Sequence, residues 1–163
     1  MLLSMRIKDW LALAGFIALS EGAGIIGSIF TVSSIQGWYT TLTRPELAPP
    51  NWVFAPVWTT LFLLMGAAAF LVWKKGWHRK DVKVALSIFL AQLALNTLWS
   101  IMFFGLQNPG AAFAEIIILW LAIVATIVTF GLISKPAAWL LVPYILWVSL
   151  ASYLNYMLWM LNQ

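Results

Sequence analysis

The side chains of this sequence that could do chemistry are few, and most of them are amides set at helical spacing. Gln92, Asn96 and Ser100 recur every four residues, so on a helix they share one face. A second row at the same spacing lies nearer the C-terminus and comprises Trp147, Ala151 and Asn155. Amides can join helices or exchange hydrogen bonds with a ligand, and this spacing is compatible with both interpretations.

Ionisable groups inside the apolar segments are rarer still. Glu21 and Glu115 are the only acids there, and an ionised side chain in hydrocarbon is costly enough to suggest a function. Glu115 lies close to the start of its segment and is expected to reach interfacial water. Glu21 lies near the middle of its segment with no intramembrane lysine or arginine, so we expect it to be protonated or hydrogen-bonded. Proton transfer through Glu21 is the alternative.

The residues that the usual metal and hydrolytic sites require are missing from the sequence. It contains no cysteine and one histidine, His78, which lies in a basic turn. Disulfide, zinc–thiolate and cysteine-nucleophile chemistry are therefore excluded, and one histidine does not complete a metal site. There is no phosphate-binding glycine loop and no Ser/His/acid set. We expect neither a metal nor a required cofactor.

Eleven tryptophans are the strongest compositional signal. Indole anchors a helix at the headgroup level, and six tryptophans lie near the ends of apolar segments: Trp10, Trp52, Trp73, Trp77, Trp139 and Trp159. Four others lie deeper: Trp58, Trp99, Trp120 and Trp147. Several rings converging inside a bundle suit a large, flat, apolar ligand such as a porphyrin or a sterol, rather than an ion or a sugar.

The elements that position these residues must cross a membrane. Of the 163 residues, 63% are hydrophobic and 9% charged, whereas soluble domains carry about 25% charged residues. This composition excludes a soluble enzyme, a nucleic-acid-binding protein and a disordered chain. Stretches of about 20 apolar residues can span a bilayer, and five qualify: residues 10–33, 52–73, 82–104, 111–133 and 137–161. We predict an all-α integral membrane protein, with residues 1–163 forming one bundle of five transmembrane helices.

The connections predict the topology. Residues 34–51 form the one long loop, which contains Pro45, Pro49 and Pro50. The first apolar stretch is too long for the core of a cleaved signal peptide, so we expect a retained helix. Of the nine basic residues only Arg44 lies on the side of the long loop. The N-terminus should therefore be cytoplasmic, with the C-terminus and the 34–51 loop on the opposite side.

Small residues indicate where helices approach closely. Ser20, Gly24 and Ser28 form a stripe along the first span, and such stripes let two helices pack at short distance.

One stretch of the sequence resembles the signature of a known family. It comprises Trp38-Tyr39, Leu42-Thr43-Arg44-Pro45 and Pro49-Pro50-Asn51-Trp52-Val53-Phe54-Ala55-Pro56-Val57-Trp58-Thr59. Further matches are Gln92-Leu93-Ala94-Leu95-Asn96, Phe103-Phe104-Gly105 and Pro143-Tyr144-Ile145-Leu146-Trp147. Over nearly its whole length the chain is similar to the translocator protein family, the tryptophan-rich sensory proteins formerly called peripheral benzodiazepine receptors. It resembles bacterial-type members, because no lysine or arginine follows Tyr156 to complete the cholesterol motif proposed for animal members.

The resemblance implies a five-helix bundle in the lipid of a membrane, with a ligand cavity between the helices and the first loop as its cover. It also implies a homodimer with the third helix at the interface, where Ser87 and Ala91 form a pair of small residues. The ligands that it implies are porphyrins such as protoporphyrin IX and haem, sterols, and isoquinoline carboxamide or benzodiazepine drugs.

The resemblance assigns ligand-binding positions to six residues: Tyr39, Trp58, Gln92, Asn96, Trp147 and Ala151. Trp58 and Trp147 also match tryptophans linked, in some bacterial members, to light-dependent oxidative degradation of porphyrin. A porphyrin-binding receptor or sensor is therefore our leading hypothesis. An enzyme-like degradation of porphyrin that uses Trp58 and Trp147 as catalytic residues, and a sterol or lipid transporter, are the alternatives.

Overall fold

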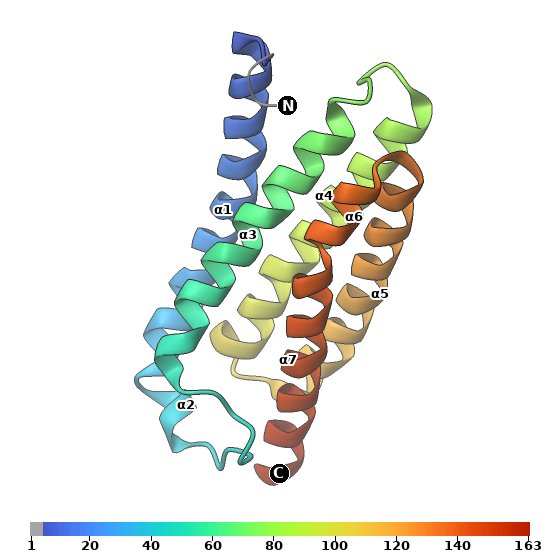
Figure 1. Cartoon of the computed structure of the whole chain (residues 1–163). Helices are drawn as coiled ribbons and strands as arrows, with labels where there is room; N and C mark the ends of the chain where they lie inside the picture. Colours follow the sequence, from blue (N-terminus) through green and yellow to red (C-terminus); the bar gives the residue numbers. More distant parts are fainter. Residues whose placement is uncertain (1–4) are drawn as a thin grey trace.

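In the computed structural model, which describes residues 5–163, five apolar segments cross the molecule as helices (Figure 1). They are α1 (Ile7–Ile35), α3 (Asn51–Trp73), α4 (Lys80–Ser100), α5 (Pro109–Ile133), and a last segment divided into α6 (Lys135–Leu140) and α7 (Val142–Leu161). A π-helical turn, η2 (Ile101–Gly105), continues α4, and a short helix, α2 (Trp38–Thr41), follows α1. The predicted fold class, an all-α membrane protein with five spanning helices, is confirmed.

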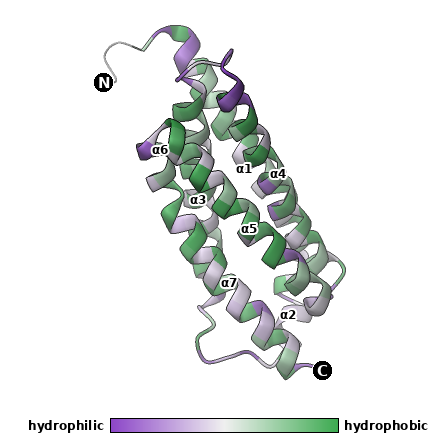
Figure 2. Cartoon of the chain, turned by 90° about the vertical axis from the view of Figure 1, so that its right-hand side faces the viewer, coloured by the Kyte–Doolittle hydropathy of each residue, from purple (hydrophilic) through white to green (hydrophobic). Residues whose placement is uncertain are grey.

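The helices pack in a closed ring. Helix α1 contacts α3 and α4, α4 contacts α5, α5 contacts α7, and α3 contacts α6. Large apolar side chains such as Ile29, Leu121 and Leu132 point outward and are more than half exposed. Figure 2 shows hydrophobic residues along most of the length of the helices. Such a surface is stable in lipid, where helices also satisfy their own backbone hydrogen bonds.

The interior is built from the inward faces of α3, α4, α5 and α7. Met65, Phe89, Ile123 and Phe130 are fully buried there, and Tyr144 is 1% exposed. A second cluster lies at the end of the bundle near α2, where Tyr39 packs against residues of η2 and α5. Since lipid is as apolar as these side chains, close packing rather than exclusion from water holds the helices together.

The last span is a broken helix rather than one continuous run over 137–161. Helix α6 ends at Leu140, and Leu141 is the residue before the first turn of α7. Pro143 lies in that first turn, where its missing N–H costs no hydrogen bond. Proline would remove a bond and clash in a helix interior, so the chain begins a new helix here.

The loop end of the bundle is tied to the C-terminal helix. The Asn162 side chain accepts a hydrogen bond from the Thr43 N–H at 2.8 Å and donates one to the Thr43 carbonyl at 3.0 Å. Arg44 donates to the Asn51 side chain at 3.2 Å. The segment between α2 and α3 is therefore held against both α3 and α7.

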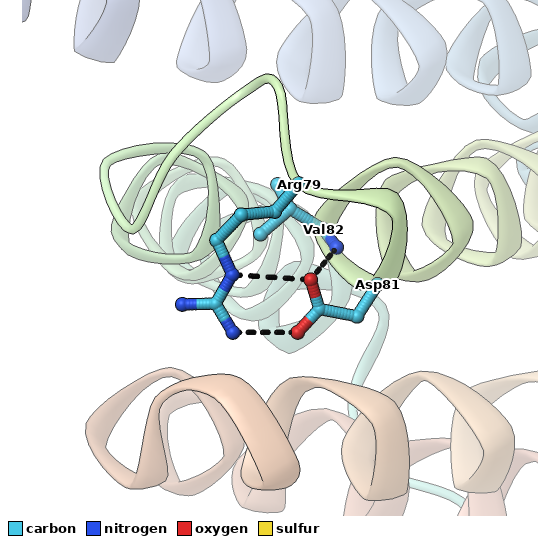
Figure 3. Close-up of polar contacts among 3 residues, drawn as sticks. All are labelled: Arg79, Asp81 and Val82. Atoms are coloured by element: carbon cyan, nitrogen blue, oxygen red, sulfur yellow. Dashed lines mark hydrogen bonds and ion pairs between the residues drawn. The ribbon is translucent and has the colours of Figure 1, made fainter.

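At the opposite end, a short basic turn joins α3 to α4 (Figure 3). Arg79 forms two hydrogen bonds with the Asp81 carboxylate, of 3.1 and 2.6 Å, and the same carboxylate accepts the Val82 N–H at 3.0 Å. This pair holds the pKa of the Arg79 guanidinium above its usual range. Arg79 therefore stays charged and is paired with Asp81 at the start of α4.

Helices α1 and α3 approach each other closely at Gly66. A Cβ atom added there would lie 2.6 Å from the Ile17 Cα and 2.9 Å from the Phe16 carbonyl oxygen, both on α1. Backbone atoms cannot move aside as a flexible side chain can. Gly66 thus allows α1 and α3 to pack backbone to backbone.

We expect Gly66→Ala to lower the free energy of unfolding by about 1–3 kcal/mol, the usual cost of overpacking. Unfolding in mixed detergent micelles would measure it. Gly22→Ala is the control, because a Cβ at Gly22 meets nothing within 4 Å and alanine favours a helix. Equal stability of the two variants would contradict this account of the α1–α3 contact.

Candidate ligand-binding site

A cavity of about 510 Å³ lies between α1, α3 and α4. Phe54, Trp58 and Phe62 line it from α3. Asn96, Trp99 and Ser100 line it from α4. The α1 wall supplies small and polar residues: Glu21, Gly24, Gly27, Ser28 and Thr31. An aromatic cavity with a few polar groups, in the range of about 300–1,000 Å³, is the usual form of a small-molecule site.

The small residues of α1, Ser20, Gly24 and Ser28, have two roles: some pack against neighbouring helices and some line the cavity. Ser20 is fully buried, and a Cβ at Gly24 would lie 2.5 Å from the Phe62 ring. Gly24 also lines the cavity, together with the exposed Ser28, whose hydroxyl donates to the Ile25 carbonyl at 2.7 Å. The stripe therefore lets α3 approach α1 at one level and leaves open space at the next.

Trp58 is the central aromatic residue of the cavity wall. Its ring stacks on Phe62 with centroids 5.6 Å apart and meets the Tyr144 ring edge-on at 6.4 Å. These two contacts fix the plane of the indole, because both neighbours are buried. A preorganised flat face at the cavity suits a flat ligand.

The two predicted amides of α4 belong to one buried hydrogen-bond chain. Asn96 donates to the Tyr144 hydroxyl at 2.8 Å, and that hydroxyl donates to the Gln92 carbonyl oxygen at 2.9 Å. Asn96 lines the cavity. Gln92 is fully buried beneath it, and its amide nitrogen lies 3.8 Å from the Met65 sulfur. The chain joins α4 to α7 and holds the Asn96 amide in one orientation.

The third amide, Asn155, joins helices. Its side-chain oxygen accepts the Trp99 indole N–H at 2.9 Å, and its nitrogen donates to the Pro109 carbonyl at 2.7 Å. Asn155 is 1% exposed, and both of its hydrogen bonds lie in a part-buried environment. It connects α7 to α4 and α5 and fixes the indole of Trp99, which lines the cavity.

Trp147 and Ala151 lie on α7 outside the cavity lining. The Trp147 ring meets Phe54 edge-on at 5.9 Å, so it stands behind a residue of the α3 wall. Its indole N–H is buried and has no hydrogen-bond partner among the described residues. The structure thus brings Trp58 and Asn96 to the cavity and places Trp147 one layer away.

Tyr39 packs under the loop rather than at the cavity. It is 3% exposed, and its ring lies 6.4 Å from Phe103 and 5.9 Å from Phe104. The Arg44 guanidinium lies over the Tyr39 ring, 5.7 Å from its centroid. Burial raises the pKa of the Tyr39 phenol, and the nearby Arg44 charge offsets only part of this rise. The hydroxyl is therefore neutral at physiological pH.

The two acids differ from each other in position. Glu21 is part-exposed on the α1 wall of the cavity. Glu115 is 5% exposed, and neither of its carboxylate oxygens has a partner among the described residues. The expectation that Glu115 reaches interfacial water is wrong, because its side chain points into the bundle and is covered by neighbouring helices.

Sequence reasoning gave no role to three residues that shape the site. Phe62 and Phe104 line the cavity, and the Tyr144 hydroxyl joins its amides. Phenylalanine on an apolar helix carries no signal that separates a cavity wall from a lipid face. Tyr144 did carry one, since a buried phenol requires a hydrogen-bond partner.

The arrangement can bind and orient a molecule but offers little acid–base chemistry. Among residues 5–163 no three histidine, cysteine or carboxylate side chains are grouped as a metal site would require. The groups that face the cavity are aromatic rings, aliphatic side chains, hydroxyls, the amides of Gln36, Asn51 and Asn96, and the Glu21 carboxyl. Recognition by shape and stacking is what these groups can provide.

Comparison with known proteins is consistent over almost the whole chain. A family model described as the TspO/MBR family matches residues 16–160. The chain is 47% identical over 155 residues to the tryptophan-rich protein TspO of Chlorobaculum tepidum, which covers 95% of this chain and 98% of that protein. It is 36% identical to the translocator protein of Ovis aries, over 94% of this chain and 92% of that one. It is 34% identical to the tryptophan-rich sensory protein of Cereibacter sphaeroides, over 94% and 93%.

Proposed function

The chain belongs to the TspO/MBR family, and from that premise we propose that it is a receptor that binds a porphyrin or a related flat, hydrophobic molecule in the cavity between α1, α3 and α4. The observation that carries the proposal is the cavity wall itself. In the cavity of about 510 Å³, Trp58 presents an indole face whose plane is fixed by stacking on Phe62. Asn96 presents an amide whose orientation is fixed by its hydrogen bond to Tyr144.

In this proposal each wall contributes a different interaction. The Trp58 ring stacks on the face of the macrocycle, and Phe54 and Trp99 close its edges. The Asn96 amide and the α1 hydroxyls meet the polar rim of the ligand. The part-exposed α1 wall gives a route of entry from the bilayer, which is where a hydrophobic ligand concentrates. We further propose, from the positive-inside rule, that the basic end of the bundle is cytoplasmic.

The test is a titration of the purified full chain with protoporphyrin IX in the dark, followed by quenching of tryptophan fluorescence. Saturable quenching, with competition by haem, is the expected result. Absence of saturable quenching would overturn the porphyrin assignment. A sterol that quenches or competes instead would point to a different ligand for the same cavity.

Light-dependent degradation of the bound porphyrin is a second candidate, favoured by the position of Trp58 on the cavity wall. A photoexcited porphyrin passes its energy to dioxygen, and the excited dioxygen adds to a carbon–carbon double bond of the macrocycle, which breaks to give two carbonyl groups. The adjacent Trp58 indole would hold that bond in the position where it is attacked. Illumination of the saturated complex then yields a new absorbing product in wild type and none in Trp58→Phe, while dark binding of the variant stays within about ten-fold. An unchanged spectrum in light would leave binding as the function.

A further inference from the structure

A second, larger hollow lies at the basic end of the bundle, away from the ligand cavity. It has a volume of about 880 Å³ and runs between the first half of α1 and the first half of α4, with the end of α3 at its head. None of its lining residues belongs to the cavity between α1, α3 and α4. The groove is therefore a separate feature of the surface.

The mouth of the groove is positively charged. Arg6, Lys8, Lys74 and Lys83 line it, against the single carboxylate of Asp9. Asp9 is 5% exposed and already engaged, because its Oδ2 accepts the backbone N–H of Arg6 at 3.1 Å and lies 3.9 Å from the Lys74 Nζ.

The remaining cations at the mouth are not neutralised. Arg6, Lys8 and Lys83 are exposed, and their side chains make no ion pair with any described residue, unlike Arg79, which pairs with Asp81 (Figure 3). The Lys83 Nζ lies 6.0 Å from the Trp77 ring centroid, a cation–π contact that holds the ammonium at the mouth.

The floor of the groove is apolar and open to the side. Phe16 and Leu19 of α1 and Phe89 and Leu90 of α4 line it, and Leu19 and Leu90 are 45% and 48% exposed. These residues lie in helices that cross the membrane. A soluble anion would gain nothing from such walls, whereas an acyl chain would.

We propose that this groove binds an anionic phospholipid, with the phosphate between Lys8 and Lys83 and an acyl chain along Leu19 and Leu90. Basic pockets between membrane helices are known to hold anionic headgroups, and each lysine near such a lipid is worth about a five-fold change in binding. Trp73 and Trp77, which also line the groove, suit the glycerol level, where indole concentrates.

The experiment is native mass spectrometry of the full chain released from a bilayer of phosphatidylglycerol and phosphatidylcholine with identical acyl chains. Wild type should retain phosphatidylglycerol at least about ten-fold over phosphatidylcholine. The double variant Lys8→Gln/Lys83→Gln should fall to about two-fold or less. The control, Lys80→Gln/Lys135→Gln, removes the same charge outside the groove lining and should keep the wild-type preference.

A third variant tests the groove without changing any charge. Ser87 lines the groove and is exposed, so Ser87→Trp should fill the space and lose the preference while the free energy of unfolding stays unchanged. If Lys8→Gln/Lys83→Gln and Lys80→Gln/Lys135→Gln lose the phosphatidylglycerol preference equally, the preference comes from the overall positive potential of the basic end. That result would overturn the proposed lipid site. Unchanged retention of phosphatidylglycerol in Ser87→Trp would also overturn it. Loss of the preference together with a fall in oligomeric mass would assign the face to a protein contact instead.

Discussion

Replacing Trp58 by alanine is expected to weaken binding of protoporphyrin IX about 30-fold in the dark. About 80–100 Å² of indole surface would be lost from the ligand contact, and at 25 cal/mol/Å² that area is worth about 2 kcal/mol. The absorbance of the porphyrin is the measurement to follow, because the variant also loses one of the fluorescent reporters. The prediction rests on the proposed function and on the position of Trp58 in the cavity wall.

Trp147→Ala is the informative comparison. The resemblance to the translocator protein family treats Trp58 and Trp147 alike, but the structure places Trp147 behind Phe54. We therefore expect Trp147→Ala to weaken binding by no more than about three-fold. Trp120→Ala is a second control, since its indole N–H bonds to Ser149 away from the cavity. Losses of equal size for Trp58 and Trp147 would show that the ligand lies elsewhere.

Replacing Tyr144 by phenylalanine is expected to cost about 2–3 kcal/mol of the free energy of unfolding in mixed micelles. The change removes the hydroxyl group that accepts a hydrogen bond from the Asn96 amide and donates one to the Gln92 carbonyl oxygen. Both amides are buried, at 4% and 0% exposure, so each is left with an unsatisfied group. For two groups the penalty in water is about 2–6 kcal/mol, whereas two membrane hydrogen bonds are worth about 1.2 kcal/mol on average and about 3.4 at most. A loss of about 2 kcal/mol is therefore expected.

Tyr153→Phe provides the matched control, because it deletes the same atom from the same helix at a side chain that is 42% exposed. Its effect should be within about 0.5 kcal/mol. Equal destabilisation by the two changes would mean that the Asn96–Tyr144–Gln92 chain contributes nothing specific. Since Asn96 also lines the cavity, Tyr144→Phe should in addition weaken porphyrin binding, through a freed amide rather than a lost contact.

The spanning elements follow from the sequence by itself. Apolar side chains on every face over more than 20 residues leave a helix in lipid as the stable solution, and five such runs give five spanning helices. The break in the last span is an exception. Pro143 marks it, but hydropathy alone does not separate a proline in a first turn from one in a kinked continuous helix.

The division of polar residues between ligand site and helix contacts was decided by the tertiary structure. The spacing places Gln92 and Asn96 on one face of their helix and Asn155 on the same face of its helix as Trp147 and Ala151. It does not decide whether these amides join helices or bind a ligand. In the fold Asn155 joins three helices, Gln92 is sealed beneath Tyr144, and Asn96 reaches the cavity. Periodicity fixes the direction of a side chain about its own helix, whereas its partner depends on how neighbouring helices are rotated and how closely they approach. Contacts such as that between Gly66 and the α1 backbone set those quantities, and they exist only once the bundle is assembled.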